Sequence, residues 1–254
     1  MSTKITFIIA VALNLLIFNQ ALAGHYELLG DYPTGVHDTK FQVFPENLEV
    51  CKAYEKNLNS FPEIHSVMVC ERPINTKLKD FKKPDWQTLD VLENKDFIKK
   101  IEKQSVYHRA NPNNFNEKQW DETFKARVEE RGIKLRYAKL EIDSDKYKYI
   151  LEYNFGGKCD PFDERWLENS GGIEYFITTK EMKEILPIIG LGELRGVFIY
   201  KGNIYFDALS YTWNDKLKKR QYEIWLYKMY YPTAEFARVP ICRFGYTGKV
   251  TILK

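Results

Sequence analysis

The sequence lacks the short motifs that most enzymes and metal proteins carry at their sites. It has four cysteines and four histidines in 254 residues, and none of them forms a Cys-x-x-Cys pair or a His-Glu-x-x-His motif. A Gly-x-Ser-x-Gly elbow and a phosphate-binding glycine loop are also missing. The common signatures of zinc hydrolases, serine hydrolases and nucleotide-binding enzymes are therefore absent, and we expect no metal site and no cofactor.

The chain also lacks a large excess of one charge. Lysine and arginine total 38 against 35 aspartates and glutamates, which gives a formal net charge of +3. Attraction to nucleic acid through bulk charge needs a stronger basic excess, so no nucleic-acid partner is expected. A hydrophobic fraction of 44% and a charged fraction of 29% are typical of a folded globular protein.

Long apolar runs are missing except at the N-terminus. There, Lys4 precedes an apolar stretch over residues 5–18, and Ala-Leu-Ala follows at 21–23. This order predicts a secretory signal peptide over residues 1–23, cleaved before Gly24. Because no second run follows, we expect an exported protein, periplasmic or extracellular, that has no membrane contact after cleavage.

All four cysteines follow the predicted cleavage site, and their number is even. In an exported chain this favours two disulfides, for which three pairings are possible. We prefer Cys51–Cys70 with Cys159–Cys242, because each pair then lies within one predicted half of the chain.

The first half of the chain, residues 24–132, is dominated by patterns of helical period. Helices are expected over residues 45–61, over 94–109, and from 114 or 116 to 132, with a short strand at 66–71. The preferred first disulfide would pin the first of these helices to that strand.

The second half, residues 133–254, changes to the alternation that is typical of strands. Strands are expected at 133–142, 147–154, 172–178, 196–200, 204–207, 222–229, 238–246 and 249–253, with a short helix at 179–189. The predicted fold class is therefore α+β, with a helical, disulfide-pinned N-terminal half packed on a mainly antiparallel β C-terminal half. The two halves form either two domains or one shared core.

Two segments resemble known families. The segment KLEIDSDKYKYILEYN, with Asp143 and Asp145, resembles the Asp-x-Asp-x-Asp-Gly units of exported FG-GAP/VCBS-type β proteins, although the third Asp and the Gly are missing. That resemblance implies a calcium loop that this chain has lost, and the same residues also suit a plain hairpin turn. The stretch VCKAYEKNLNSF…VMVCERPI resembles the N-terminal part of uncharacterised exported bacterial proteins, which implies export and a Cys51–Cys70 link but no activity.

Aromatic residues are unusually dense over residues 205–231. Strand alternation would place Tyr222, Ile224 and Leu226 on one face of a strand and Trp225 and Tyr227 on the other. Two apolar faces indicate either a strand between two layers or one exposed face that binds a partner. The residues predicted to bind are Tyr211, Trp213, Trp225 and Tyr227.

The acidic segment after Cys159 carries the alternative function. Asp160, Asp163, Glu164 and Glu168 lie near Trp166, and paired carboxylates beside an aromatic ring are found in glycoside hydrolases. A solvated acidic loop accounts for the same residues.

The sequence favours a non-enzymatic exported binding protein, such as a periplasmic inhibitor or a toxin-immunity protein that acts by occlusion. Its expected partner is a protein, with a glycan as the alternative. The competing hypothesis is an exported hydrolase that acts on cell-wall or polysaccharide substrates through the four acids.

Overall fold

A computed structural model of the chain describes residues 25–29, 32–33, 40–41, 43–61, 71–104, 115–140, 149–156, 173–188, 193–214, 219–229 and 240–246. Two antiparallel sheets dominate it. The six-stranded sheet has the order β1 (Tyr26–Leu28), β13 (Cys242–Tyr246), β12 (Lys219–Lys228), β11 (Asn203–Asn214), β10 (Glu193–Tyr200) and β4 (Phe81–Lys82). The five-stranded sheet has the order β5 (Gln87–Leu89), β6 (Lys134–Lys139), β7 (Tyr149–Asn154), β8 (Ile173–Thr178) and β9 (Ile185–Ile188).

Three α-helices accompany these sheets in the described part of the chain. They are α2 (Leu48–Leu58), which follows the short 3-10 helix η1 (Pro45–Asn47), α3 (Lys95–Gln104) and α5 (Glu117–Arg131). A separate two-stranded ladder joins β2 (Tyr32–Pro33) to β3 (Lys40–Phe41). No helix within the described ranges is both long enough and apolar enough to cross a membrane.

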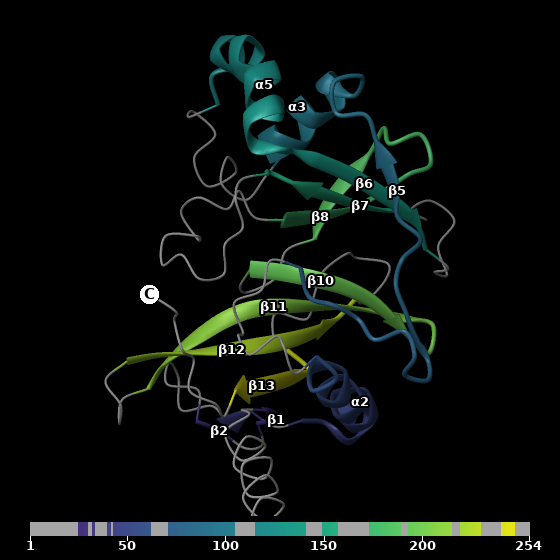
Figure 1. Cartoon of the computed structure of the whole chain (residues 1–254), viewed down its shortest axis with the longest axis vertical. Coiled ribbons are helices and arrows are strands. Elements are labelled where there is room, and N and C mark those ends of the chain that lie inside the picture. Colours follow the sequence, from purple (N-terminus) through teal and green to yellow (C-terminus); the bar gives the residue numbers. More distant parts are fainter. Residues whose placement is uncertain are drawn as a thin grey trace, which may run out of the picture.

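The helices and sheets stack in four layers, in the order helix, sheet, sheet, helices (Figure 1). Three apolar clusters fill the spaces between them. The first packs α2, through Tyr54, against Phe198 and Phe244 of the six-stranded sheet. The second lies between the two sheets, and the third packs α3 and α5 on the outer face of the five-stranded sheet. Both sheets are therefore covered on both faces over their central strands.

The prediction of an α+β fold with a helical N-terminal half is wrong. Strands make up 41% of the structure, and the N-terminal half contributes strands to both large sheets. β1 and β4 form the two edges of the six-stranded sheet, and β5 forms an edge of the other. Each of these strands has only two or three residues, so none of them shows an alternating pattern that sequence analysis could detect.

Several individual elements were predicted correctly. The side chain of Asn116 accepts a hydrogen bond from the backbone N–H of Gln119 at the start of α5, and Gly132 ends that helix in the left-handed region at φ 66°. The predicted hairpins are present as β6–β7 and β10–β11. The helix expected at 179–189 is absent, because residues 185–188 form β9 and pair with β8. The strand expected at 249–253 lies outside the described residues.

The preferred disulfide pairing is also wrong, because Cys51 is bonded to Cys242. The two Cα atoms are 5.7 Å apart although 191 positions separate the residues. The reason is that α2 packs across the six-stranded sheet and brings Cys51 against the start of β13. Of the three possible pairings, only the one that joins Cys70 to Cys159 is compatible with this bond, and both of those residues lie outside the described part.

Candidate functional site

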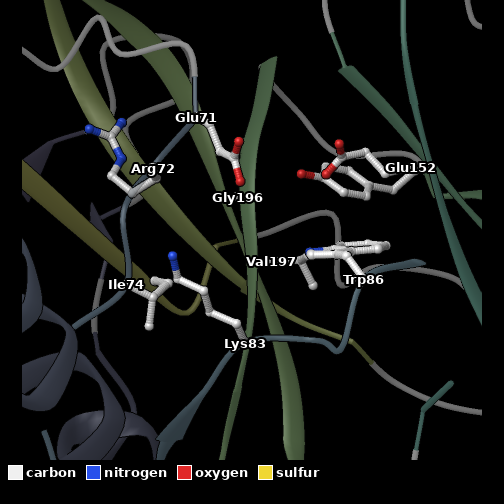
Figure 2. Close-up of a pocket in the computed structure, with 9 residues that line it drawn as sticks. Glu71, Arg72, Ile74, Lys83, Trp86, Glu152, Gly196 and Val197 are labelled. Atoms are coloured by element: carbon white, nitrogen blue, oxygen red, sulfur yellow. The ribbon is translucent and has the colours of Figure 1, made fainter. Parts of the chain in front are cut away.

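A small polar pocket lies between the two sheets (Figure 2). Its lining residues are Glu71, Arg72, Ile74, Lys83, Trp86, Glu152, Tyr175, Gly196 and Val197. The carboxylates of Glu71 and Glu152 reach into it from opposite sides, one from the loop before β4 and the other from β7. Its free volume is about 10 Å³, which is space for about one water molecule.

Arg136 on β6 contacts three of the residues that line this pocket. Its Nε donates to Glu152 Oε1 at 2.8 Å and its Nη2 donates to Glu152 Oε2 at 2.7 Å. The same Nη2 lies 3.3 Å from Glu71 Oε1, and the guanidinium stacks 5.2 Å from the centre of the Trp86 ring. Arg136 therefore holds both carboxylates and one aromatic ring in place.

Burial and charge act in opposite directions on Glu152, whose side chain is only 3% exposed. Burial raises the pKa of this carboxyl group, and the attraction of Arg136 offsets only part of that rise. A carboxyl group of this kind is a candidate proton donor wherever a substrate can reach it. Here Arg136 occupies both oxygens, and the pocket has room only for water.

A second ion pair includes Arg72, another residue that lines the pocket. Arg72 Nε is 2.6 Å from Asp207 Oδ2 on β11, and Tyr54 of α2 donates to the same oxygen. Gly196 leaves the space that this carboxylate needs, since a Cβ atom there would lie 2.8 Å from Asp207 Oδ1. The charges around the pocket thus join separate elements, and the pocket is best described as a structural junction.

The strands of the six-stranded sheet pair over unequal lengths, and β11 and β12 extend beyond their neighbours. β11 and β12 pair over ten positions, from Tyr205↔Lys228 to Asn214↔Lys219. β10 pairs with β11 only as far as Leu209, and β13 pairs with β12 only as far as Glu223. Residues 210–214 and 219–222 therefore form a two-stranded ribbon that projects past the neighbouring described strands (Figure 1).

The ribbon contains two of the four residues predicted to bind. Tyr211 lies opposite Tyr222 in the register, and Trp213 lies opposite Arg220. Directly opposite residues and those two positions along share a face of the ladder, so these four residues occupy one face of the ribbon. The side chains of residues 211–222 are outside the described part of the structure.

The other two predicted binding residues lie elsewhere. Tyr227 is fully buried in the cluster between the sheets. Trp225 is half-buried, donates from Nε1 to Glu223 Oε2 at 2.8 Å, and lies 5.5 Å from the Arg243 guanidinium. The expected alternation is present, because Ile224 and Leu226 face α2 while Trp225 and Tyr227 face the second sheet. The four aromatic residues do not form one patch.

The acids of the alternative hypothesis lie outside the described residues: Asp160, Asp163, Glu164 and Glu168. The same is true of Asp143 and Asp145 in the calcium-like segment. Within the described ranges, no group of three or more His, Cys, Asp or Glu side chains could hold a metal ion.

The pair Arg136–Glu152 was not identified from the sequence. It could have been found, because the two residues are directly opposite in a hairpin that the sequence predicted. The contacts of Arg136 with Glu71 and Trp86 join distant segments and leave no mark in the sequence.

No family model, no curated protein and no solved structure matches this chain.

Proposed function

We propose that the protein is an exported, non-enzymatic binding protein that covers a site on a protein partner with its β11–β12 ribbon. The observation that carries this proposal is the projection of the ribbon beyond β10 and β13, with Tyr211, Trp213 and Tyr222 at register positions on one face. Tyrosine, tryptophan and arginine are the residue types most enriched among the side chains that dominate binding energy at protein interfaces.

The base of the ribbon is anchored firmly, which favours binding. Leu209 and Ile224 lie directly opposite each other where the ribbon begins, and both are buried under α2. An isolated two-stranded hairpin is only marginally stable in water, whereas this one continues two strands of a packed sheet. A preorganised ribbon loses less conformational entropy on binding than a flexible loop does.

Export is supported by the predicted signal peptide and is compatible with the Cys51–Cys242 disulfide. Disulfides persist in oxidising compartments such as a periplasm or the extracellular medium. An inhibitor or an immunity protein in such a compartment would act by steric occlusion and would need no catalytic residues of its own.

The test uses the purified, oxidised protein as bait against envelope and secreted fractions of its source. We expect one stoichiometric protein partner, identified by mass spectrometry. The double variant Tyr211→Ala, Trp213→Ala should weaken that complex at least about ten-fold. The matched control is Phe44→Ala, which removes an aromatic side chain that is 58% exposed and does not belong to the ribbon.

Equal affinity of the double variant and the wild-type protein would reject the ribbon as the binding surface. Failure of the folded, oxidised bait to retain any protein partner would reject the function itself. Substrate screening with polysaccharides would then test the hydrolase hypothesis.

A further inference from the structure

The outer edge of β1 is bonded to side chains of α2. In the part of the chain that the structure describes, β1 has one strand neighbour, β13, and the N–H of Leu29 donates to the Arg243 carbonyl oxygen of that strand at 2.8 Å. Alternate residues of an edge strand direct their backbone groups to opposite sides. The backbone groups of Tyr26 and Leu28 therefore face away from β13, on the side where a further strand would pair.

Three of these outward groups form hydrogen bonds with two side chains near the end of α2. Asn59 Oδ1 accepts from the Tyr26 nitrogen at 2.8 Å, and Asn59 Nδ2 donates to the Tyr26 oxygen at 2.9 Å. Glu55 Oε1 accepts from the Leu28 nitrogen at 2.8 Å. Figure 1 shows α2 beside β1 and β13 at this end of the six-stranded sheet.

The side chain of Asn59 takes the place of a peptide group. Its amide carries both an acceptor and a donor, as the backbone does. In an antiparallel ladder, a hydrogen-bonded pair of residues exchanges N–H···O bonds in both directions. Asn59 and Tyr26 also exchange bonds in both directions. At Tyr26, β1 thus has the hydrogen bonds of an inner strand although it lies at the edge of its sheet.

A second asparagine of α2 binds another segment in the same way. Asn57 Oδ1 accepts from the Asn75 nitrogen at 2.7 Å, and Asn57 Nδ2 donates to the Pro73 oxygen at 3.3 Å. Asn57 is fully buried, whereas Asn59 is exposed and Glu55 is half-buried. Asn57 therefore joins two parts of the interior, while Asn59 and Glu55 act at an edge of the sheet near the surface.

The fold holds α2 firmly against this edge. Cys51 is bonded to Cys242 of β13, the strand next to β1. Glu55 and Asn59 follow Cys51 at intervals of four residues, so the three side chains lie along one side of the helix. Tyr54 of the same helix is fully buried in the cluster under α2. Both side chains are thus kept in reach of β1.

We propose that Glu55 and Asn59 form an intramolecular block that prevents the edge of β1 from pairing with β1 of a second copy of the chain. An open strand edge offers its N–H and C=O groups to any other strand. A second copy fits this edge, because two identical edges related by a two-fold axis present each other with the same donors and acceptors. Since β13 separates β1 from β12, the block is independent of any partner of the ribbon.

The test removes both side chains from the purified, oxidised protein. In sedimentation velocity, Glu55→Ala, Asn59→Ala should self-associate at least about ten-fold more strongly than the wild-type protein, because three backbone groups of β1 become available to a second copy. Asn59→Ala alone frees two of these three groups and should give most of the gain. Equal self-association of the double variant and the wild-type protein would overturn the proposal.

Two control variants separate the block from changes of charge or of the helix. Glu55→Gln has the same net charge as the double variant but keeps an oxygen that can accept from Leu28. Lys52→Ala, Lys56→Ala changes two exposed residues of the same helix. Both controls should stay within about two-fold of the wild-type self-association. A gain in either control as large as that of the double variant would overturn the proposal.

Leu28→Pro tests whether the association uses this edge. Proline removes the N–H that is bonded to Glu55 and leaves the N–H of Leu29 on β13 intact. Proline is tolerated on edge strands where the N–H faces away from the sheet. Added to the double variant, it should return self-association to within about two-fold of wild type. Circular dichroism and thermal unfolding confirm that each variant is folded, and association that persists in the folded triple variant would overturn the proposal.

Hydrogen exchange gives a second readout that needs no proline. In the double variant, the amides of Tyr26 and Leu28 should exchange faster than in the wild-type protein at low concentration, and should slow again as the concentration rises. The amide of Leu29, which is bonded to β13, should change little. Exchange at Tyr26 and Leu28 that does not depend on concentration would reject pairing at this edge. An equal rise at all three amides would show that β1 has detached from β13, and it would reject the block as well.

Discussion

Arg72 and Asp207 form a fully buried ion pair, with Arg72 Nε 2.6 Å from Asp207 Oδ2, although 135 positions separate them in the chain. Their side chains are 2% and 1% exposed. Tyr54 of α2 donates a hydrogen bond to the same oxygen at 2.9 Å. One carboxylate on β11 therefore connects the helix that covers the six-stranded sheet with the loop that leads to its edge strand β4.

The variant Asp207→Ala should be strongly destabilised. It leaves the Arg72 guanidinium charged in the core without its carboxylate, and breaking a buried pair from one side costs about 3–5 kcal/mol. Urea unfolding followed by tryptophan fluorescence measures the loss. Glu122→Ala, which removes an exposed pair with Lys118 on α5, is the control and should change the free energy of unfolding by less than about 0.5 kcal/mol. A similar small loss in both variants would contradict the assigned role of Asp207.

Gly196→Ala should disturb the same ion pair through its volume. The added Cβ would lie 2.8 Å from Asp207 Oδ1 and 3.1 Å from the Cβ atom of Arg72, so one of the two residues must move. We expect a loss of about 1–3 kcal/mol in the free energy of unfolding, as in other overpacked cores. Combined with Asp207→Ala, the glycine substitution should cost much less, which a double-mutant cycle would detect. Full additivity of the two losses would show that the strain lies elsewhere.

Glu102 should prove important for the helical layer on the five-stranded sheet. This carboxylate on α3 is 3% exposed and accepts hydrogen bonds from Trp120 Nε1 at 2.6 Å and from Tyr153 Oη on β7. Arg127 lies 3.2 Å away. Glu102→Ala removes the common acceptor of these buried donors, at a cost of about 3 kcal/mol or more. Hydrogen exchange should show faster opening of α3 and α5, with no change in α2; uniform exchange across all three helices would contradict this.

Alkaline pH should weaken the fold through buried tyrosines. Burial raises the pKa of Tyr26 to about 12 from its usual value of 10, and it raises the pKa values of Tyr54 and Tyr175 above their ordinary range. The native state then holds protons that the unfolded state releases, so stability is complete below pH 10 and falls as pH rises toward 12. Tyr26→Phe should recover about 2 kcal/mol of that loss at about pH 11.5. Urea unfolding at about pH 9 and about pH 11.5 tests this, and equal stabilities at the two pH values would refute it.

Reduction of the disulfide should destabilise the six-stranded sheet. Cys51 and Cys242 are 191 positions apart, and the chain-entropy model gives about 5 kcal/mol for a loop of that size. The variant Cys51→Ser, Cys242→Ser should therefore unfold at a lower urea concentration than the oxidised protein and should no longer respond to reductant at this bond. Peptide mapping without reduction should recover the Cys51–Cys242 linked peptide. A Cys51–Cys70 peptide in its place would contradict the fold.

The three described α-helices and the hairpins β6–β7 and β10–β11 were predictable because their signals are local. Asn116 and Gly132 mark the ends of α5, and the hairpin β6–β7 follows from alternation over adjacent segments. The layer arrangement was not predictable, because it depends on strands such as β4 and β5 that are too short to show a pattern. The disulfide was not predictable for a related reason, because Cys51 and Cys242 lie in different halves of the sequence and meet only in the assembled fold.

The residues of the candidate site were also only partly predictable. The aromatic density of residues 205–231 predicted Tyr211 and Trp213 as binding residues, and both lie in the ribbon. The same density predicted Tyr227 as a binding residue, but Tyr227 is buried between the sheets. Alternation alone cannot show which faces of a strand are covered. The extent of the ribbon depends on where β10 and β13 stop pairing, and that is a property of the assembled sheet.

The position of β13 sets the order in which the two large sheets can form while the chain is synthesised. All strands of the five-stranded sheet lie between residues 87 and 188, so that sheet can assemble while the C-terminal part is still being made. β1 pairs only with β13 among the described strands, and Cys51 bonds to the first residue of β13. β1 must therefore wait until residues 242–246 have emerged. A product truncated before residue 242 would keep every strand of one sheet but would leave β1 and Cys51 without their partners in the other.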